Sequence, residues 1–108
     1  MTLAIDIGNT NIVFGIFYNQ KLISIYRINS IKEEIYKVDF LSKYDLKHII
    51  ISSVVPELTN DMKKFCEKKF NLKSFILKHN NVPNLQLDIN NPAQLGTDRI
   101  CNTVATIS

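Results

Sequence analysis

Two short polar segments of the sequence combine residue types that could hold a phosphorylated ligand. The first, Asp6-Ile-Gly-Asn-Thr-Asn11, follows an apolar stretch near the N-terminus. Gly8 permits backbone angles closed to other residues, and we expect it to let the chain approach a ligand closely. The turn amides and the Asn9 and Thr10 side chains would then donate to phosphate oxygens. Asp6 stands in an apolar strand, where a carboxylate needs a partner or a metal, and it could hold hydrated Mg²⁺ against nucleotide phosphates. The alternative is an ordinary hairpin, because Asp, Gly and Asn are common in turns.

The second segment is Asn91-Pro-Ala-Gln-Leu-Gly-Thr-Asp-Arg99, which we expect to open a helix. Asp98 and Arg99 are adjacent, so one helix start could present both side chains. A carboxylate there can accept the proton of a substrate hydroxyl as a general base. The planar guanidinium of Arg99 suits a carboxylate or a phosphate. The alternative is that Asp98 only stabilises the helix N-terminus and Arg99 forms a surface ion pair.

Other reactive side chains form no comparable group. The histidines have no companions at metal-ligand spacing and are expected on the surface. The cysteines lie far apart and are expected to be reduced thiols of a cytosolic protein. The serine pair has no glycine elbow around it and no identifiable base. The histidines are His48 and His79, the cysteines are Cys66 and Cys101, and the serine pair is Ser52 and Ser53.

The elements that must position the first segment form an antiparallel meander. Residues 2–8 alternate well enough to predict a strand, and residues 12–18 and 22–28 predict two more, with residues 19–21 as a hairpin loop. Ser30 followed by Glu33 is a capping-box pattern, which predicts the start of a helix. Apolar residues then recur at helical spacing through this predicted helix. They are Ile31, Ile35, Val38 and Leu41.

The remaining elements complete an α/β sheet. Residues 49–55 are a β-branched run, which predicts a strand buried on both faces, and therefore parallel and central. Pro56 suits the first turn of a helix, whose inner side would carry apolar residues. A fifth strand is expected at residues 73–77, followed by a polar connection and a last helix from about Gln94. The inner residues of the middle helix are Leu58, Met62, Phe65 and Cys66.

The predicted order is β-β-β-α-β-α-β-α with a mixed five-stranded sheet, which corresponds to one lobe of the actin-like architecture (acetate and sugar kinases, Hsc70, actin). At 108 residues the chain is long enough for one domain, residues 1–108. Only two of the 13 basic residues are arginines, and the lysines are scattered among acidic residues, so the net charge of +3 does not indicate nucleic-acid binding. The chain shows no signal peptide and no membrane-spanning run, which favours a cytoplasmic protein.

Three segments together resemble type III pantothenate kinases. They are the opening MTLAIDIGNTNIVFGIF, the central Ile51-Ser-Ser-Val-Val-Pro56 and the final NPAQLGTDRICNTVA, in the order and at about the spacing of that family. The resemblance implies transfer of the γ-phosphoryl group of ATP to pantothenate, giving 4′-phosphopantothenate in the first committed step of coenzyme A synthesis. It also implies a cytoplasmic homodimer that requires Mg²⁺ and a monovalent cation, K⁺ or NH₄⁺.

The resemblance also assigns roles to residues. Asp98 would be the catalytic proton acceptor, and Arg99 would lie near the carboxylate of pantothenate. The implied ATP-phosphate loop consists of Asp6, Ile7, Gly8, Asn9, Thr10, Asn11, Ile12 and Val13. The implied pantothenate-binding residues are Gly96, Thr97, Asp98 and Arg99.

The sequence departs from the family pattern at two positions and in length. Ile89 stands where the family often has a substrate-contacting tyrosine, and Thr97 stands where alanine is usual. Family members are about twice as long, as two lobes require. The C-terminal lobe is therefore expected to be absent from these 108 residues, with its second phosphate loop, its adenine site and its cation-binding aspartate. We expect this chain alone to have no appreciable kinase activity, since one lobe supplies half of the phosphate clamp.

Two alternatives remain: a non-catalytic accessory or regulatory relative, and another actin-like phosphotransferase such as a sugar kinase.

Overall fold

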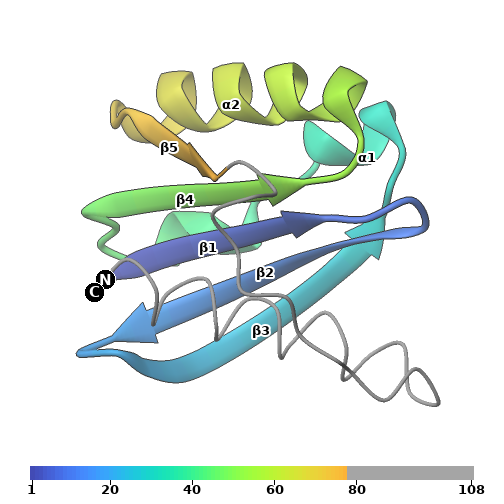
Figure 1. The fold of residues 1–108 in the computed structure, drawn as a ribbon. Coiled ribbons are helices and arrows are strands. Elements are labelled where there is room, and N and C mark those ends of the chain that lie inside the picture. Colours follow the sequence, from blue (N-terminus) through green and yellow to red (C-terminus); the bar gives the residue numbers. More distant parts are fainter. Residues whose placement is uncertain (78–108) are drawn as a thin grey trace, which may run out of the picture.

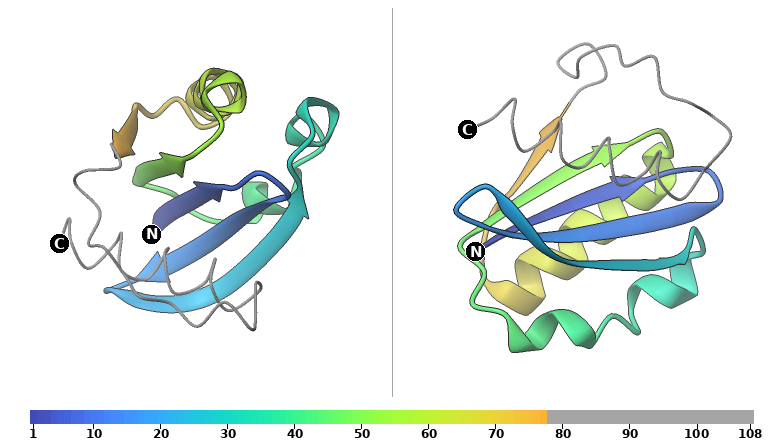
Figure 2. Two further views of the ribbon diagram at one scale, coloured as in Figure 1. Left: turned by 45° about the vertical axis from the view of Figure 1, so that its right-hand side comes forward. Right: turned by 90° about the horizontal axis from the view of Figure 1, so that it is seen from below.

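A computed structural model of the chain describes residues 1–77. These residues form a mixed five-stranded sheet in the order β3-β2-β1-β4-β5, with its helices on one face (Figure 1 and Figure 2). The elements are β1 (Thr2–Ile7), β2 (Asn11–Tyr18), β3 (Lys21–Asn29), α1 (Lys32–Ile35), the 3₁₀ helix η1 (Phe40–Lys43), β4 (His48–Ser53), α2 (Pro56–Phe70) and β5 (Ser74–Leu77).

The first three strands form the predicted antiparallel meander. The register pairs Asp6 with Val13 across β1 and β2, and Val13 with Arg27 across β2 and β3. The β2–β3 hairpin turns on Asn19 and Gln20, whose φ angles are 51° and 67°. Two consecutive residues with positive φ are the requirement of a type I′ turn, whose twist matches that of the flanking strands.

The β-branched run forms β4, which is parallel to both of its neighbours, β1 and β5. Four consecutive residues of this strand, Ile49 to Ser52, are buried, as expected for a strand covered on both faces. The strand ends at Ser53, two residues before the predicted end, and the N–H of Val54 just beyond it donates to the carbonyl of Ile7 at 3.0 Å. The predictions of a parallel, buried strand and of Pro56 at the first turn of α2 are confirmed, and β4 is an interior strand, although the central strand of the sheet is β1.

The main hydrophobic core lies between the sheet and the helices. Leu3, Ile5 and Ile7 face it from β1 and are at most 1% exposed. Leu58, Met62 and Cys66, spaced four residues apart on α2, cover them from the helical side. The alternate residues of β1 point to the opposite face, where Ala4 joins a smaller cluster with Val13, Phe17 and Leu22.

The helix predicted after Ser30 is wrong in length and in its cap. Its N-cap residue is Ile31, no side chain caps it, and the helix ends after one turn at Ile35. The chain continues as an irregular segment and η1 because Phe40 packs against Phe14 and stacks on Tyr26, at ring-centroid distances of 5.6 and 4.2 Å. These aromatic contacts bring the segment down onto β2 and β3.

Three of the four apolar residues predicted at helical spacing nevertheless reach the core. Ile35, Val38 and Leu41 are at most 1% exposed, whereas Ile31 is 48% exposed.

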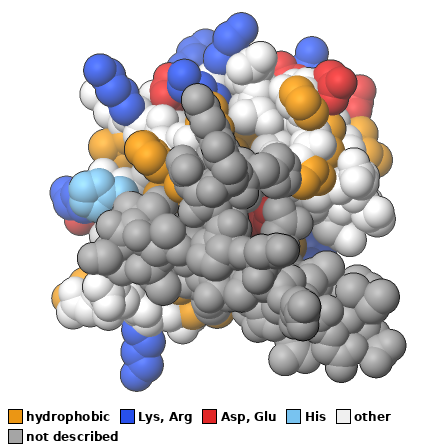
Figure 3. Space-filling model, viewed as in Figure 1, with side chains coloured by type: hydrophobic (Ala, Val, Ile, Leu, Met, Phe, Trp, Pro, Cys, Tyr) orange, Lys and Arg blue, Asp and Glu red, His pale blue; other side chains and the backbone are white. Residues whose placement is uncertain are grey.

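The predicted last helix, from about Gln94, lies outside the described residues. On the face seen in Figure 3, lysine and arginine side chains stand among aspartate and glutamate side chains. No helix in the described part of the chain is both long and apolar enough to cross a membrane.

Candidate functional site

The β1–β2 turn forms the tip of the candidate site. The N–H of Gly8 donates to the carbonyl of Asn11 at 2.9 Å and closes the turn, which leaves Asn9 and Thr10 exposed. Neither described glycine has a positive φ, so the turn does not use the positive-φ conformations that Gly8 permits. The close approach that Gly8 permits is to its own chain, because a Cβ atom there would lie 3.2 Å from the Asn11 carbonyl oxygen.

Ser30, directly after β3, holds this turn from outside. Its hydroxyl donates to the carbonyl of Gly8 at 2.6 Å, and its backbone N–H donates to the carbonyl of Thr10 at 2.9 Å. The Ser30–Glu33 pattern predicts a local helix cap, and the partner that it predicts for the Ser30 hydroxyl is wrong. The bond to Gly8 spans 22 residues, and only the pairing of the three strands reveals it.

Asp6 lies on the sheet face opposite the main core. It is 4% exposed and sits between Val13 of β2 and Ser52 of β4 in the register. Paired residues of adjacent strands point to the same face about 5 Å apart, so Ser52 is the neighbour of Asp6. Ser52 is itself buried at 5% exposure. No base is identifiable near Ser52 and Ser53 from the sequence, whereas the register of β1 and β4 places Ser52 beside the Asp6 carboxylate.

The loop between β4 and α2 meets the turn at the same edge of the sheet. The bond between Val54 and Ile7 joins the ends of β4 and β1. Ser53 fixes the loop, since its Oγ accepts from the N–H of Val55 at 2.9 Å and donates to the Val55 carbonyl at 3.1 Å. In α/β sheets, ligands bind beyond the carboxyl ends of the strands, and here the turn, this loop and the start of α2 come together at such an edge.

The predicted phosphate loop contains buried residues that anchor it and exposed residues that a ligand could reach. Ile7 and Ile12 are 0% exposed and anchor the turn in the main core, while Val13 belongs to the cluster on the opposite face. Asn9 and Thr10 are the exposed residues that a ligand could contact. The predicted residues Gly96, Thr97, Asp98 and Arg99, together with Ile89, lie outside the described part of the chain.

Comparison with known proteins decides the family. The profile of the type III pantothenate kinases matches residues 2–108. The chain belongs to the type III pantothenate kinase family. It is 36% identical over 116 residues to the type III pantothenate kinase of Syntrophus aciditrophicus, covering 97% of this chain and 46% of that protein. It is 34% identical to those of Geotalea uraniireducens and Listeria monocytogenes, with 97% of this chain and 45% of each relative covered. The chain thus spans about half the length of the curated relatives it matches.

Family membership agrees with the fold. The sheet order β3-β2-β1-β4-β5, with an antiparallel meander beside parallel strands, corresponds to an actin-like kinase lobe. The turn that resembles the phosphate loop of type III pantothenate kinases lies at the carboxyl end of the central strand β1, next to the parallel strand β4. Within residues 1–77, no group of three or more His, Cys, Asp and Glu side chains could hold a metal ion.

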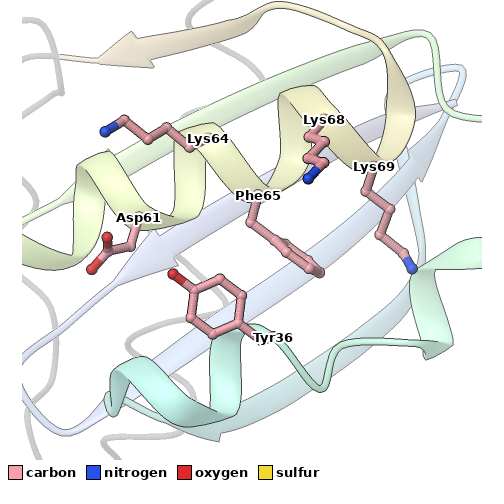
Figure 4. A pocket seen from close by; sticks show the side chains of 6 residues that line it. All are labelled: Tyr36, Asp61, Lys64, Phe65, Lys68 and Lys69. Atoms are coloured by element: carbon pink, nitrogen blue, oxygen red, sulfur yellow. The ribbon is translucent and has the colours of Figure 1, made fainter.

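A separate pocket lies between α1 and α2 (Figure 4). It has a volume of about 520 Å³, and the rings of Tyr36 and Phe65 meet edge to face in it with centroids 5.8 Å apart. The Lys69 ammonium lies 5.8 Å from the Phe65 ring centroid and 3.8 Å from the Asp39 carboxylate. None of the predicted site residues lines it. Its lining residues are Tyr36, Asp61, Lys64, Phe65, Lys68 and Lys69.

Proposed function

We propose that the protein to which this chain belongs transfers the γ-phosphoryl group of ATP to pantothenate, giving 4′-phosphopantothenate. The proposal rests mainly on the turn at the end of β1, which the Gly8–Asn11 hydrogen bond closes and the Ser30 hydroxyl holds in place. This turn lies next to the buried Asp6, in a chain of the type III pantothenate kinase family. The relatives that match the chain are themselves named type III pantothenate kinases.

The turn would bind the phosphates of ATP. Exposed Asn9 and Thr10 supply side-chain and backbone donors, and the anchored residues on both sides hold those donors in place before the ligand arrives. Asp6 supplies one carboxylate beside the turn, and this oxygen donor fits a hydrated Mg²⁺ ion. When bound, such an ion would neutralise charge on the phosphates.

The substrate side of the proposal rests on the sequence. Asp98 would accept the proton of the pantothenate hydroxyl, and Arg99 would pair with the pantothenate carboxylate. Gly96 and Thr97 would line the same subsite. We further propose a cytoplasmic homodimer that requires K⁺ or NH₄⁺, with the cation-binding aspartate beyond residue 108. These residues alone would supply one lobe, so we propose that they have no appreciable activity without the other.

The test is ATP- and pantothenate-dependent formation of 4′-phosphopantothenate by the protein from the complete reading frame. We expect turnover by the wild type, and a loss of kcat by about 10²- to 10⁴-fold in Asp98→Asn, as for removal of a general base. Asp6→Asn should lose activity mainly through weaker MgATP binding. Asp45→Asn is the control, because its carboxylate is a surface group that pairs with Lys47 at 3.5 Å.

Three results would count against the proposal. Absence of turnover by the wild type, with ATP still bound, would favour the accessory or regulatory relative. Turnover of a sugar in preference to pantothenate would favour another actin-like phosphotransferase. Full activity of Asp98→Asn would remove the proposed proton acceptor.

A further inference from the structure

We propose that Ser30 is a positioning residue for the phosphate turn, and that its hydroxyl sets the affinity of the site for ATP. The inference deepens the proposed function and rests on it. Ser30 stands outside the segment that resembles the family's phosphate loop, at the junction of β3 and the segment leading to α1. Its side chain has no place in the helix cap that the sequence suggests, because Ile31 is the cap residue.

Ser30 engages both ends of the exposed pair, Asn9 and Thr10. Its hydroxyl binds the carbonyl that precedes the pair, on Gly8, and its N–H binds the carbonyl that ends the pair, on Thr10. A third bond, from the Gly8 N–H to the Asn11 carbonyl, closes the turn. Three backbone carbonyls of the turn therefore accept hydrogen bonds within the protein, and two of these bonds come from Ser30.

Because each peptide unit is planar, a hydrogen bond that fixes a backbone carbonyl of the turn also fixes the direction of the next N–H group. The C=O of one residue and the N–H of the next belong to one planar unit and point in opposite directions when the bond is trans. No cis peptide bond occurs in residues 1–77, so a Gly8 carbonyl held toward Ser30 directs the Asn9 N–H away from it. Within the described residues, no hydrogen bond uses the N–H groups of Asn9 or Thr10. Both donors are thus left for a ligand, and the Ser30 hydroxyl fixes the direction of the first.

The role requires a hydroxyl in particular. A carbonyl oxygen accepts only from a donor, and Ser30 is half-buried, so water replaces a lost hydroxyl poorly. Threonine retains the donor and valine has the shape of threonine without it. The matched pair Ser30→Thr and Ser30→Val therefore separates the hydrogen bond from the change in volume. Ser30→Ala removes the donor without adding volume, and it replaces Ser30→Val if the larger side chain prevents folding. Ser42→Ala is the control, because Ser42 is an exposed serine of η1.

The experiment measures kcat, the KM for ATP, the KM for pantothenate and the Tm of each variant in the complete protein. Loss of the hydroxyl should raise the KM for ATP about threefold to tenfold, which is the range of one hydrogen bond. The KM for pantothenate should stay within about twofold of the wild type, and Ser30→Thr should restore the KM for ATP.

A purely structural role of Ser30 gives a different result. The Tm and the fraction of active protein would fall, while the KM for ATP would stay at the wild-type value in the molecules that remain active. That result would overturn the inference, as would an equal rise of both KM values or a failure of Ser30→Thr to restore the KM for ATP. A wild type that binds no ATP would overturn the proposed function as well, so the two failures are distinguishable.

Discussion

The stability of the fold should decrease at alkaline pH through the single thiol of α2. Cys66 is 0% exposed, and burial, with a smaller contribution from the Glu67 carboxylate, raises the pKa of its thiol from 9.0 to about 12. Because the folded pKa is higher, the unfolded chain loses this proton first as the pH rises. The contribution of the protonated thiol to stability is fully present below pH 9 and is lost progressively as the pH rises toward 12.

The size of the effect follows from the two pKa values. The loss is small at pH 8, about 1.4 kcal/mol at pH 10, and grows by about 1.4 kcal/mol for each further pH unit until the folded thiol titrates. The variant Cys66→Ala has no thiol to ionise at this position, so its own cost, a small cavity, is constant with pH. The free-energy difference between the wild type and this variant should therefore shrink by about 1.4 kcal/mol between pH 8 and pH 10.

Urea unfolding of both proteins at pH 7, 8, 9 and 10, followed by circular dichroism, measures this difference. Lysines and tyrosines also titrate at high pH, but they are present in both proteins and cancel. Cys101 cancels for the same reason. A difference that stays constant from pH 7 to pH 10 would refute the reasoning, because it would mean that the Cys66 thiol ionises as readily in the folded protein as in the unfolded chain.

Two further predictions concern the sheet and the turn. Phe14→Ala should destabilise the fold by about 3–5 kcal/mol in urea unfolding, because Phe14 is 0% exposed. Phe75 is 56% exposed, so Phe75→Ala should destabilise the fold by less than about 1 kcal/mol. Equal losses of stability in the two variants would contradict the assignment of the core. Gly8→Ala would place its Cβ 3.2 Å from the Asn11 carbonyl oxygen, so the turn must widen by a few tenths of an ångström; we expect weaker ATP binding with a change in stability of less than about 1 kcal/mol, and unchanged affinity would show that the turn has room for a side chain.

The strands were predictable because their signals are local. The apolar residues that mark β1 to β3, and the β-branched run of β4, lie next to one another in the chain. Pro56 marked the start of α2 for an equally local reason, since its backbone has no N–H to satisfy. The burial of Ile35, Val38 and Leu41 was also predictable, although the helix that was expected to present them forms only one turn.

The contacts that complete the site were not predictable in this way. The partner of the Ser30 hydroxyl is a carbonyl 22 residues earlier, and Ser52 becomes a neighbour of Asp6 only when β4 pairs with β1. Both contacts depend on strand register, which a sequence pattern does not specify between distant segments. The one-turn length of α1 likewise depends on tertiary contacts, because Phe40 packs against rings of β2 and β3.

The bracing of the turn also has a consequence for the order of folding. Asp6 and the turn belong to the antiparallel meander, and Ser30 follows its last strand; the pairings of the meander join segments that are close in the chain. By contrast, the pairing of β1 with β4, such as Thr2 with His48, joins segments that are separated by β2, β3, α1 and η1. Local pairings cost less loop-closure entropy and form faster than distant ones. We therefore expect the meander, with the Ser30 brace already in place, to act as the template onto which β4 docks. A substitution at Ser30 would then slow folding as well as weaken the finished turn, whereas a substitution in β5 would mainly speed unfolding.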